Sequence, residues 1–446
     1  MNRHPNTKLS GISAFYALLV GQFISSIGSA MTRFGLSVWV YTNTGSTIAY
    51  TTLLFFSVFP VGIGALIAGP LVDRWDRRRV LIVSDTLAGL STLLVAALFF
   101  FDALALWHLY VLLSVNGIAS AFSRPALDAS VPLLVPRAQL SRAAGLSQVV
   151  WALEMILAST LAGFLIGAFG LGVIFLIDVV TFGANMLLLL MLAIPRPPRS
   201  EGQRAAGGFR AELLDGLRYV QQRPGMRYLL GLFTATMFLL PGFAYSLITP
   251  LVLTFAGETT LGLILSGFGV GSLVGGAVMA AVGARRRVGG ILATMAVAGL
   301  AAILISLREN PWLVGLGSVI TGLSFVVMIG LNRAIWQQKA APDMLGRVFA
   351  LQLALGVGAQ SLGVIMAGSL ADAVFEPLLA QTGALASTVG ALIGTGPGRG
   401  MALMFLVVGM LQLVIVLCSV LSPAVRELED RLPDAQAGPL IQNPAP

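Results

Sequence analysis

The chain has 446 residues, of which 57% are hydrophobic and only 10% are charged, and its mean hydropathy is +0.90. A soluble domain carries about 25% charged residues, so these charges cannot cover a water-exposed surface and lipid must be the main solvent. The net charge of +8 does not indicate a nucleic-acid partner, because the basic residues fall between apolar runs and not on one amphipathic face.

Side chains that bind metals or act as nucleophiles are scarce. Cys418 is the single cysteine and the histidines are His4 and His108, so disulfides within the chain and cysteine or histidine metal clusters are excluded. The sequence has no phosphate-binding Gly-Lys-Ser/Thr loop, which excludes direct ATP coupling in this chain. It also lacks a nucleophile–base constellation. We therefore predict no cofactor and no enzymatic activity.

Twelve apolar runs are each long enough to cross about 30 Å of hydrocarbon, which takes about 20 residues. Lipid offers the backbone no hydrogen-bond partner, so every run must form a closed helix. We predict an all-α polytopic membrane protein with twelve transmembrane helices. The first run follows a polar start, Met1 to Ser10, without a small-residue cleavage site, so it is interpreted as a retained helix. The predicted spans are 12–41, 48–71, 80–101, 106–127, 143–168, 171–194, 226–254, 260–283, 289–307, 311–337, 347–374 and 400–421.

The connections between spans alternate in charge. One set, together with both chain ends, holds nearly all the basic residues, whereas the opposite connections carry Arg308 and Arg399. The positive-inside rule makes the basic side cytoplasmic. We expect both termini in the cytoplasm and the protein in a bacterial inner membrane. The basic side collects Arg3, Lys8, Arg74, Arg77, Arg78, Arg79, Arg137, Arg142, seven arginines from Arg196 to Arg227, Arg285 to Arg287, Lys339, Arg347, Arg426 and Arg431.

The first span has one polar face. Gln22, Ser26, Ser29 and Arg33 are spaced i, i+4, i+7 and i+11, which puts them on the same side of a helix. Charges inside a span are costly and face a cavity or a partner. These four side chains are therefore predicted to line a cavity.

The connection after the second span reads Gly69-Pro-Leu-Val-Asp73-Arg74-Trp-Asp76-Arg77-Arg78-Arg79. A glycine there allows helices to approach closely, and Asp73 can accept from a helix N-terminus or an arginine at a gate. The alternative is a solvated basic loop that serves topology alone.

The fifth and sixth spans each contain a carboxylate. In the fifth, Ser147, Trp151, Glu154 and Ala158 line one face, with Glu154 near the bilayer centre. In the sixth, Asp178 follows Ile177. Both are candidate functional residues by default, because acidic side chains are rare in lipid.

Residues 195–225 divide the chain, with Pro-Arg-Pro-Pro, a Gly/Ala/Arg stretch and a short amphipathic segment near Phe209 to Val220. Six predicted spans lie on each side, and the sequences after spans four and ten echo each other, as in parallel-repeat transporters. The predicted parts are an N-terminal bundle (1–194), a cytoplasmic linker (195–225), a C-terminal bundle (226–421) and a cytoplasmic tail (422–446).

The second half carries few charges. Its seventh span holds Phe238 and Tyr245, and its eleventh holds Gln352 and Gln360. Aromatic residues in spans usually serve packing, but this set also suits a cavity for an apolar, bulky ligand. The external segment 375–399 is rich in glycine, which leaves open an ordered loop or a mobile cap.

The loop after the second span resembles the signature loop of the major facilitator superfamily in its glycine, Asp-Arg pair and basic cluster. Phe122-Ser-Arg-Pro125-Ala-Leu-Asp128-Ala-Ser-Val-Pro132 and Leu345-Gly-Arg347-Val further resemble macrolide-efflux-type drug:proton antiporters. The resemblance implies two six-helix bundles around a central cavity. It also implies a cytoplasmic gate cluster, formed here by Gly69, Asp73, Arg74, Arg77, Arg78 and Asp128.

The same resemblance implies that spans one and five are neighbours, which makes Arg33 and Glu154 candidates for an ion pair, either for proton coupling or for fixing helix register. It makes span six peripheral, so Asp178 is expected to brace helices ahead of carrying protons. The chain departs from its relatives at Asn116, where they commonly carry an arginine midway along span four. Asn116 is included among the predicted cavity residues.

The predicted function is export of small amphipathic compounds, such as macrolide-like drugs, driven by proton antiport, with Glu154 as the titrating group. The expected partners are a small-molecule substrate, protons and the lipid bilayer, and the expected oligomeric state is a monomer. Export of a siderophore or peptide natural product is one alternative. A nutrient importer and a non-transporting membrane sensor or partner protein are others.

Overall fold

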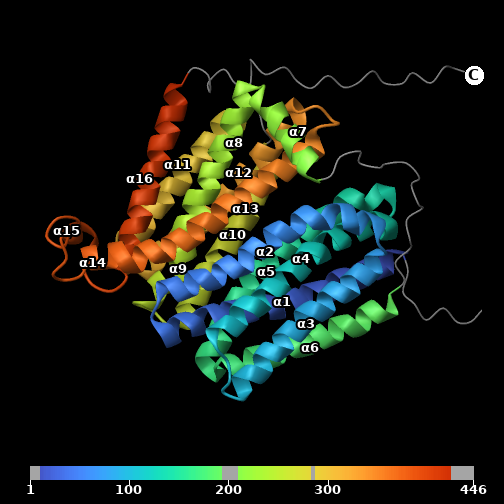
Figure 1. Cartoon of the computed structure of the whole chain (residues 1–446), viewed down its shortest axis with the longest axis horizontal. Coiled ribbons are helices and arrows are strands. Elements are labelled where there is room, and N and C mark those ends of the chain that lie inside the picture. Colours follow the sequence, from blue (N-terminus) through green and yellow to red (C-terminus); the bar gives the residue numbers. More distant parts are fainter. Residues whose placement is uncertain (1–10, 193–208, 283–286, 423–446) are drawn as a thin grey trace, which may run out of the picture.

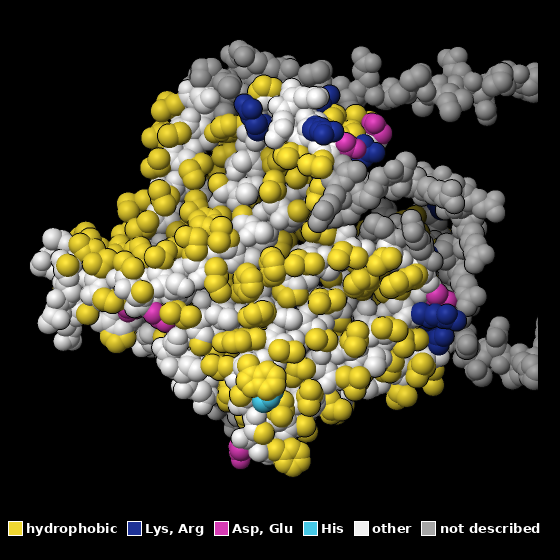
Figure 2. All heavy atoms as spheres, viewed as in Figure 1, with side chains coloured by type: hydrophobic (Ala, Val, Ile, Leu, Met, Phe, Trp, Pro, Cys, Tyr) yellow, Lys and Arg dark blue, Asp and Glu magenta, His cyan; other side chains and the backbone are white. Residues whose placement is uncertain are grey.

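The computed structural model describes residues 11–192, 209–282 and 287–422, without the side chains of 69, 70, 73, 74, 209–212 and 282 (Figure 1). These residues are almost entirely helical. Twelve of their helices are long and apolar enough to span a membrane, which confirms the predicted fold class. Hydrophobic side chains cover most of the visible face, and the charged ones gather toward its ends (Figure 2).

The first half forms six long helices with one short 3₁₀ turn, η1 (Arg137–Gln139). They pack mainly on one another: α1 contacts α5 and α6, α2 and α3 contact α4, and α3 contacts α6. The helices are α1 (Gly11–Thr44), α2 (Thr47–Arg74), α3 (Arg77–Phe100), α4 (Leu106–Leu134), α5 (Leu140–Phe169) and α6 (Leu171–Met191).

The second half has more interruptions. Its seventh span is built from α8 (Pro224–Met237), the π-helix η2 (Phe238–Ala244), η3 (Tyr245–Leu247) and α9 (Ile248–Leu253). The other spans are α10 (Glu258–Val282), α11 (Arg287–Ser306), α12 (Pro311–Lys339), α13 (Leu345–Leu370) extended by η4 (Ala371–Phe375) and α14 (Glu376–Leu378), and α16 (Arg399–Leu421).

Span boundaries agree with the sequence within a few residues, with one larger difference. The fourth span was expected to end at residue 127, but α4 continues through Pro125 and Pro132 to Leu134. Each proline removes one backbone donor, yet both are accommodated. As a result Arg124 and Asp128 lie inside α4 and not at its end.

Two sides of the molecule can be defined from the chain. The side on which α1 begins and α16 ends is called the terminal side here, and the two groups of helices diverge toward it (Figure 1). On the opposite side the halves are in close contact, through α5 with α10 and α2 with α13. Added side chains at Gly163 and Gly262 would overlap the partner helix, so glycine is what lets α5 and α10 approach so closely.

The segment 375–399 is an ordered loop, which settles the alternative left open by its sequence. It contains α14 and α15 (Val389–Ile393). The buried Arg399 forms an ion pair with Glu309 (Nε to Oε1, 3.0 Å) and donates to the carbonyl of Ile393 (2.9 Å). Glu376 accepts from the backbone amides of Gly398 and Met401 at the start of α16. These bonds fasten the loop to the second half.

The predicted amphipathic segment is α7 (Phe209–Gln221). It packs on α13, where Asp215 pairs with Arg347 at 3.4 Å. The hydroxyl of Tyr219 accepts from the amide of Ala341 (2.9 Å), and Arg223 lies over the Tyr219 ring. The described end of the linker is thus docked on the second half at the terminal side.

Candidate functional site

Two cavities meet in the middle of the molecule. The polar cavity, of about 410 Å³, lies among α1 to α6, and the central cavity, of about 700 Å³, lies between the two halves. Glu154 and five other residues line both, so the two spaces share a wall. The other five are Arg33, Ser57, Leu113, Arg124 and Trp151.

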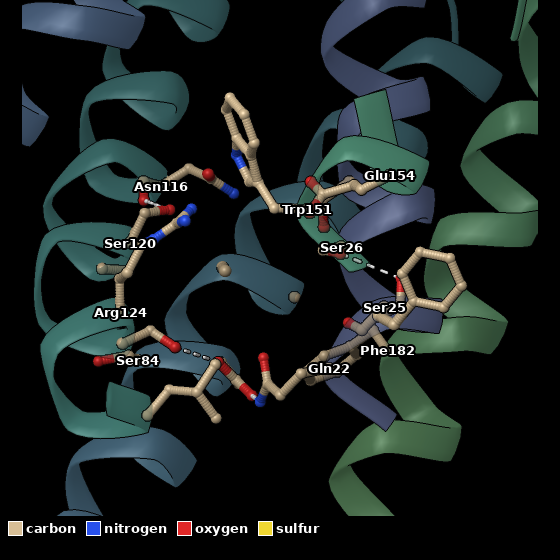
Figure 3. A pocket seen from close by; sticks show the side chains of 18 of the residues that line it. Gln22, Ser25, Ser26, Ser84, Asn116, Ser120, Arg124, Trp151, Glu154 and Phe182 are labelled. Carbon is tan, nitrogen blue, oxygen red and sulfur yellow. Dashed lines mark hydrogen bonds between the residues drawn. The ribbon is translucent and has the colours of Figure 1, made fainter. Parts of the chain in front are cut away.

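Three helices supply the polar lining through side chains repeated every three or four residues. The face predicted for α1, with Gln22, Ser26, Ser29 and Arg33, lines the polar cavity. From α4, Asn116, Ser120 and Arg124 face the first helix and the Trp151–Glu154 face of α5 across the space (Figure 3). The predicted cavity residues of the first half are therefore all brought together.

Arg33 and Glu154 share these cavities, but they do not form the expected ion pair. No nitrogen–oxygen distance between these two described side chains is within 4.0 Å. The rotation of α1 turns Ser29 and Thr32 toward Asp178 on the neighbouring α6, and Arg33 follows Thr32 on the same turn.

Asp178 is buried at 1% exposure and accepts three hydrogen bonds from hydroxyl groups. The donors are Ser29 (3.1 Å) and Thr32 (2.8 Å) on α1 and Thr92 (3.1 Å) on α3. One carboxylate thus joins three helices. This geometry is what a bracing residue requires.

Asp85, at the terminal-side part of α3, has a similar arrangement. It accepts from Gln22 on α1 (2.7 Å), Ser123 on α4 (3.2 Å) and Asn185 on α6 (2.9 Å). These partners come from three separate helices, so no pattern within α3 alone points to them.

The second half contributes a neutral wall. Tyr245 and Gln360 line the central cavity as predicted. An aromatic row continues from Tyr245 to Phe268 (5.4 Å between ring centroids) and on to Phe325 (5.9 Å). Phe268 and Phe325 were not singled out in the sequence, since lone aromatic residues in apolar runs carry no distinguishing signal.

Two predicted cavity residues lie elsewhere. Phe238 lines a groove among α8, α13 and α16, because the π-helix η2 begins at that residue and changes the helical period. Its seven-residue spacing from Tyr245 would otherwise put both on one face. Gln352 is buried on α13, where the amide of Asn332 approaches its oxygen at 3.5 Å. It packs between α12 and α13 and is not part of the cavity lining.

The predicted gate cluster is described in part. The side chains of Gly69, Asp73 and Arg74 lie outside the described residues. Asp76 caps α3 by accepting from the amides of Arg78 and Arg79. Arg78 donates to the carbonyls of Leu189 and Leu190 in the last turn of α6 (3.2 and 2.8 Å). Arg77 donates to the Trp75 carbonyl.

Asp128, the remaining member of that cluster, is exposed and lines the polar cavity one turn after Arg124. Arg124 is the cavity residue that sequence reasoning missed. In the sequence, Arg124 lies within the Phe122 to Pro132 segment that resembles the efflux family, near the end of the fourth span. The signal was available, since residue 124 fell within the predicted span and continues the Asn116–Ser120 spacing.

The side chains that line this site can bind a ligand and can exchange protons. It combines exposed guanidinium groups, carboxylates, hydroxyls and an aromatic wall. In the described residues no cluster of three or more His, Cys, Asp or Glu side chains is arranged to hold a metal ion.

Comparison with known proteins agrees with this architecture. The Major Facilitator Superfamily model matches residues 18–364. The chain belongs to this superfamily. Its fold is similar to the solved structures of the nucleoside transporter NupG (TM-score 0.72, 12% identity, 91% of this chain and 99% of that one) and of a bacterial homolog of the lysosomal transporter Spinster (0.65, 15%, 97% and 98%).

Curated relatives include efflux proteins. The chain is 28% identical to macrolide efflux protein A of Streptococcus pyogenes over 382 residues, covering 84% of this chain and 92% of the relative. It is 26% identical to the multidrug efflux pump Tap of Mycolicibacterium fortuitum over 366 residues, covering 80% and 88%. The protein is thus a multi-pass membrane transporter and not an enzyme, as predicted.

Proposed function

We propose that this protein exports small amphipathic compounds, macrolide-like drugs among them, out of a bacterial cytoplasm in exchange for protons. The observation that carries the proposal is the position of Glu154, on the wall shared by the polar and central cavities. At that position one carboxylate can exchange a proton and also sense whether the central cavity is occupied.

The central cavity suits an amphipathic ligand. Its charged lining residues, Arg33, Arg124 and Glu154, all come from the first half. The second half offers Tyr245, Phe268 and other neutral side chains. A compound with a polar end and a bulky apolar body would match both walls. The names of the efflux relatives point to the same class of substrate.

The proposed orientation in the membrane rests on the charge pattern. The positive-inside rule makes the terminal side cytoplasmic, with both chain ends there and the membrane being the bacterial inner membrane. The halves are in contact on the opposite side, so this conformation gives access from the cytoplasm. The predicted parts 1–194 and 226–421 act as the two moving bundles, whereas residues 195–208 of the predicted linker and 423–446 of the predicted tail lie outside the described residues. One chain supplies both cavities, so a monomer suffices.

The coupling depends on differential binding. A proton on Glu154 removes one negative charge from the shared wall, so the protonated and substrate-bound forms favour different arrangements of the bundles. Arg33 lies on the same wall and feels this change without having to break a direct ion pair. Asp178 braces α1, α3 and α6 and carries no proton during the cycle.

The test is Glu154→Gln, which mimics the protonated state permanently. We expect export to lose its dependence on the pH gradient, while counterflow of a radiolabelled macrolide in proteoliposomes continues. Asp102→Asn is the matched control, because Asp102 is exposed outside both cavities and its positive φ of 54° suits asparagine. Uphill export by the Glu154→Gln protein that still responds to a collapsed pH gradient contradicts the role of Glu154.

The substrate class has its own test. Susceptibility and export profiling of a deletion strain across macrolides, dyes, siderophores and peptides distinguishes the candidates. Loss of siderophore or peptide export alone in the deletion strain would replace drug export with export of a natural product. An unchanged profile for every compound would favour a sensor or partner protein.

A further inference from the structure

The polar and central cavities share a wall but extend to different places. Asn116, Ser120 and Asp128 line the polar cavity, within the first half. Ser37 lines the central cavity, between the halves. The two cavities join at the wall that contains Glu154. A proton that leaves Glu154 can therefore enter the polar cavity and need not pass through the central cavity, where the substrate binds.

The polar cavity extends along α4 toward the terminal side. Asn116, Ser120, Arg124 and Asp128 recur every four residues and so lie along one face of the helix. At 1.5 Å per residue, the twelve residues from Asn116 to Asp128 cover about 18 Å. Asp128 is exposed and lies six residues before the end of α4 at Leu134. The cavity therefore connects mid-membrane to the mouth of the bundle.

Polar groups continue on the facing helices. Ser147 lies seven residues before Glu154 on α5, which is about 10 Å along the axis. Gln22 and Ser26 line the cavity from α1 (Figure 3). Side chains at this spacing can hold a chain of hydrogen-bonded waters, because each water then finds two or more polar partners.

The charge balance of the two cavities has opposite sign. The polar cavity is lined by four carboxylates, from Asp85, Asp128, Glu154 and Asp178, and two guanidinium groups, from Arg33 and Arg124. The central cavity is lined by Glu154 and the same two arginines. When all are ionised the first is net negative and the second net positive. A proton is therefore drawn to the polar cavity, where the three carboxylates beyond Glu154 offset the repulsion from the two arginines.

We propose that the polar cavity of the first half is the proton route, separate from the substrate route, with Glu154 at the junction and Asp128 at the terminal-side mouth. This rests on the proposed function. When a substrate enters the central cavity, the Glu154 carboxyl gives its proton to water in the polar cavity. The proton then leaves past Asp128 and does not pass the substrate. Asp85 and Asp178 stay hydrogen-bonded to their helices and supply charge.

Cysteine accessibility tests the two routes separately. The natural Cys418 is first replaced by serine, which leaves no other cysteine. Ser120→Cys should then react with a small charged thiol reagent from the terminal side whether or not a macrolide is present. Ser37→Cys should be protected by the macrolide at least tenfold. An unreactive Ser120→Cys, or macrolide protection of both cysteines to the same extent of tenfold or more, overturns the proposal.

A plug in each cavity gives the functional test. Ser120→Leu should slow macrolide-driven proton movement at least tenfold and leave macrolide counterflow within about twofold. Ser37→Leu, the matched serine-to-leucine control, should do the reverse. Parallel loss of both activities in Ser120→Leu means a single route, and unchanged proton movement means that the polar cavity is not used.

A measurement made without substrate tests the proton route independently of the proposed export function. After a pH jump, the infrared carboxyl band assigned with Glu154→Gln should change at least tenfold more slowly in Ser120→Leu than in the wild type. If macrolides protect neither cysteine, the substrate assignment fails, and this measurement still decides the proton route. An unaltered rate overturns it.

Discussion

Removing the carboxylate of Asp372 should open the side of the molecule opposite to the chain termini. Asp372 lies in η4 of the second half, yet it accepts hydrogen bonds from Ser46 Oγ (3.2 Å) and the amide of Ile48 (3.0 Å) at the start of α2 in the first half. Next to it, a side chain at Gly368 would overlap Thr51, so α2 and α13 are tightly apposed there. These bonds can form only while the two halves are closed on this side.

The magnitude follows from those two bonds. A hydrogen bond to a charged group contributes about 1.5–3 kcal/mol when well buried, and a carboxylate at a helix N-terminus adds about 0.3–1 kcal/mol. Asp372 is only half-buried, and water replaces part of the loss, so about 1–2 kcal/mol remains. At 1.4 kcal/mol per factor of ten, Asp372→Ala should shift the closed-to-open ratio by about 5- to 30-fold.

The assay is a pair of spin labels at Asp102 and Leu392, both exposed and one in each half, in the Cys418→Ser background. Asp372→Ala should increase the population with the longer distance. Glu376→Ala is the matched control, because that carboxylate lies one turn away but caps α16 within its own half. The same distances in Asp372→Ala and wild type, or the same shift in Glu376→Ala, would refute the reasoning.

Three further predictions concern Asp178 and the topology. Asp178→Ala should lower the free energy of unfolding by roughly 2–4 kcal/mol, since three hydroxyl donors lose their acceptor, and thermal unfolding in detergent measures this. Asp178→Asn should keep export coupled to the pH gradient, and a folded but uncoupled Asp178→Asn protein would make it a proton carrier. A reporter that works only in the cytoplasm should be active when fused after Pro446, and one that works only in the periplasm should be inactive there, because basic residues cluster at both chain ends. Activity of the periplasmic reporter would contradict the proposed topology.

Sequence periodicity correctly predicted the features that depend on a single helix. The twelve spans and the polar faces of α1 and α5 follow from composition and from 3.6-residue spacing, and the structure places those faces on one cavity. Phe238 was misplaced by the same rule, because a π-helix changes the period locally. The apolar sequence around Pro241 contains no pattern that predicts a π-helix, which has more residues per turn than an α-helix.

Side-chain contacts between different helices were harder to predict from the sequence. Whether Arg33 meets Glu154 depends on how α1 is rotated relative to α5, and the sequence of one helix does not fix that angle. The triple contacts of Asp85 and Asp178 have the same origin. Asp372 was hidden for another reason: its partners are backbone and a serine more than 300 positions earlier in the chain.

The distribution of bonds suggests how the two halves divide the work of transport. Asp85 joins α3 to α1, α4 and α6, and Asp178 joins α6 to α1 and α3, so the first half should move as one body while Glu154 gains or loses a proton. Between the halves, glycines at α5–α10 and α2–α13 leave smooth contacts with few side chains to disengage. Rigid bundles with a smooth interface can rock between two arrangements. A change of one charge on the shared wall then needs to outweigh only a few bonds, such as those of Asp372, to select one arrangement.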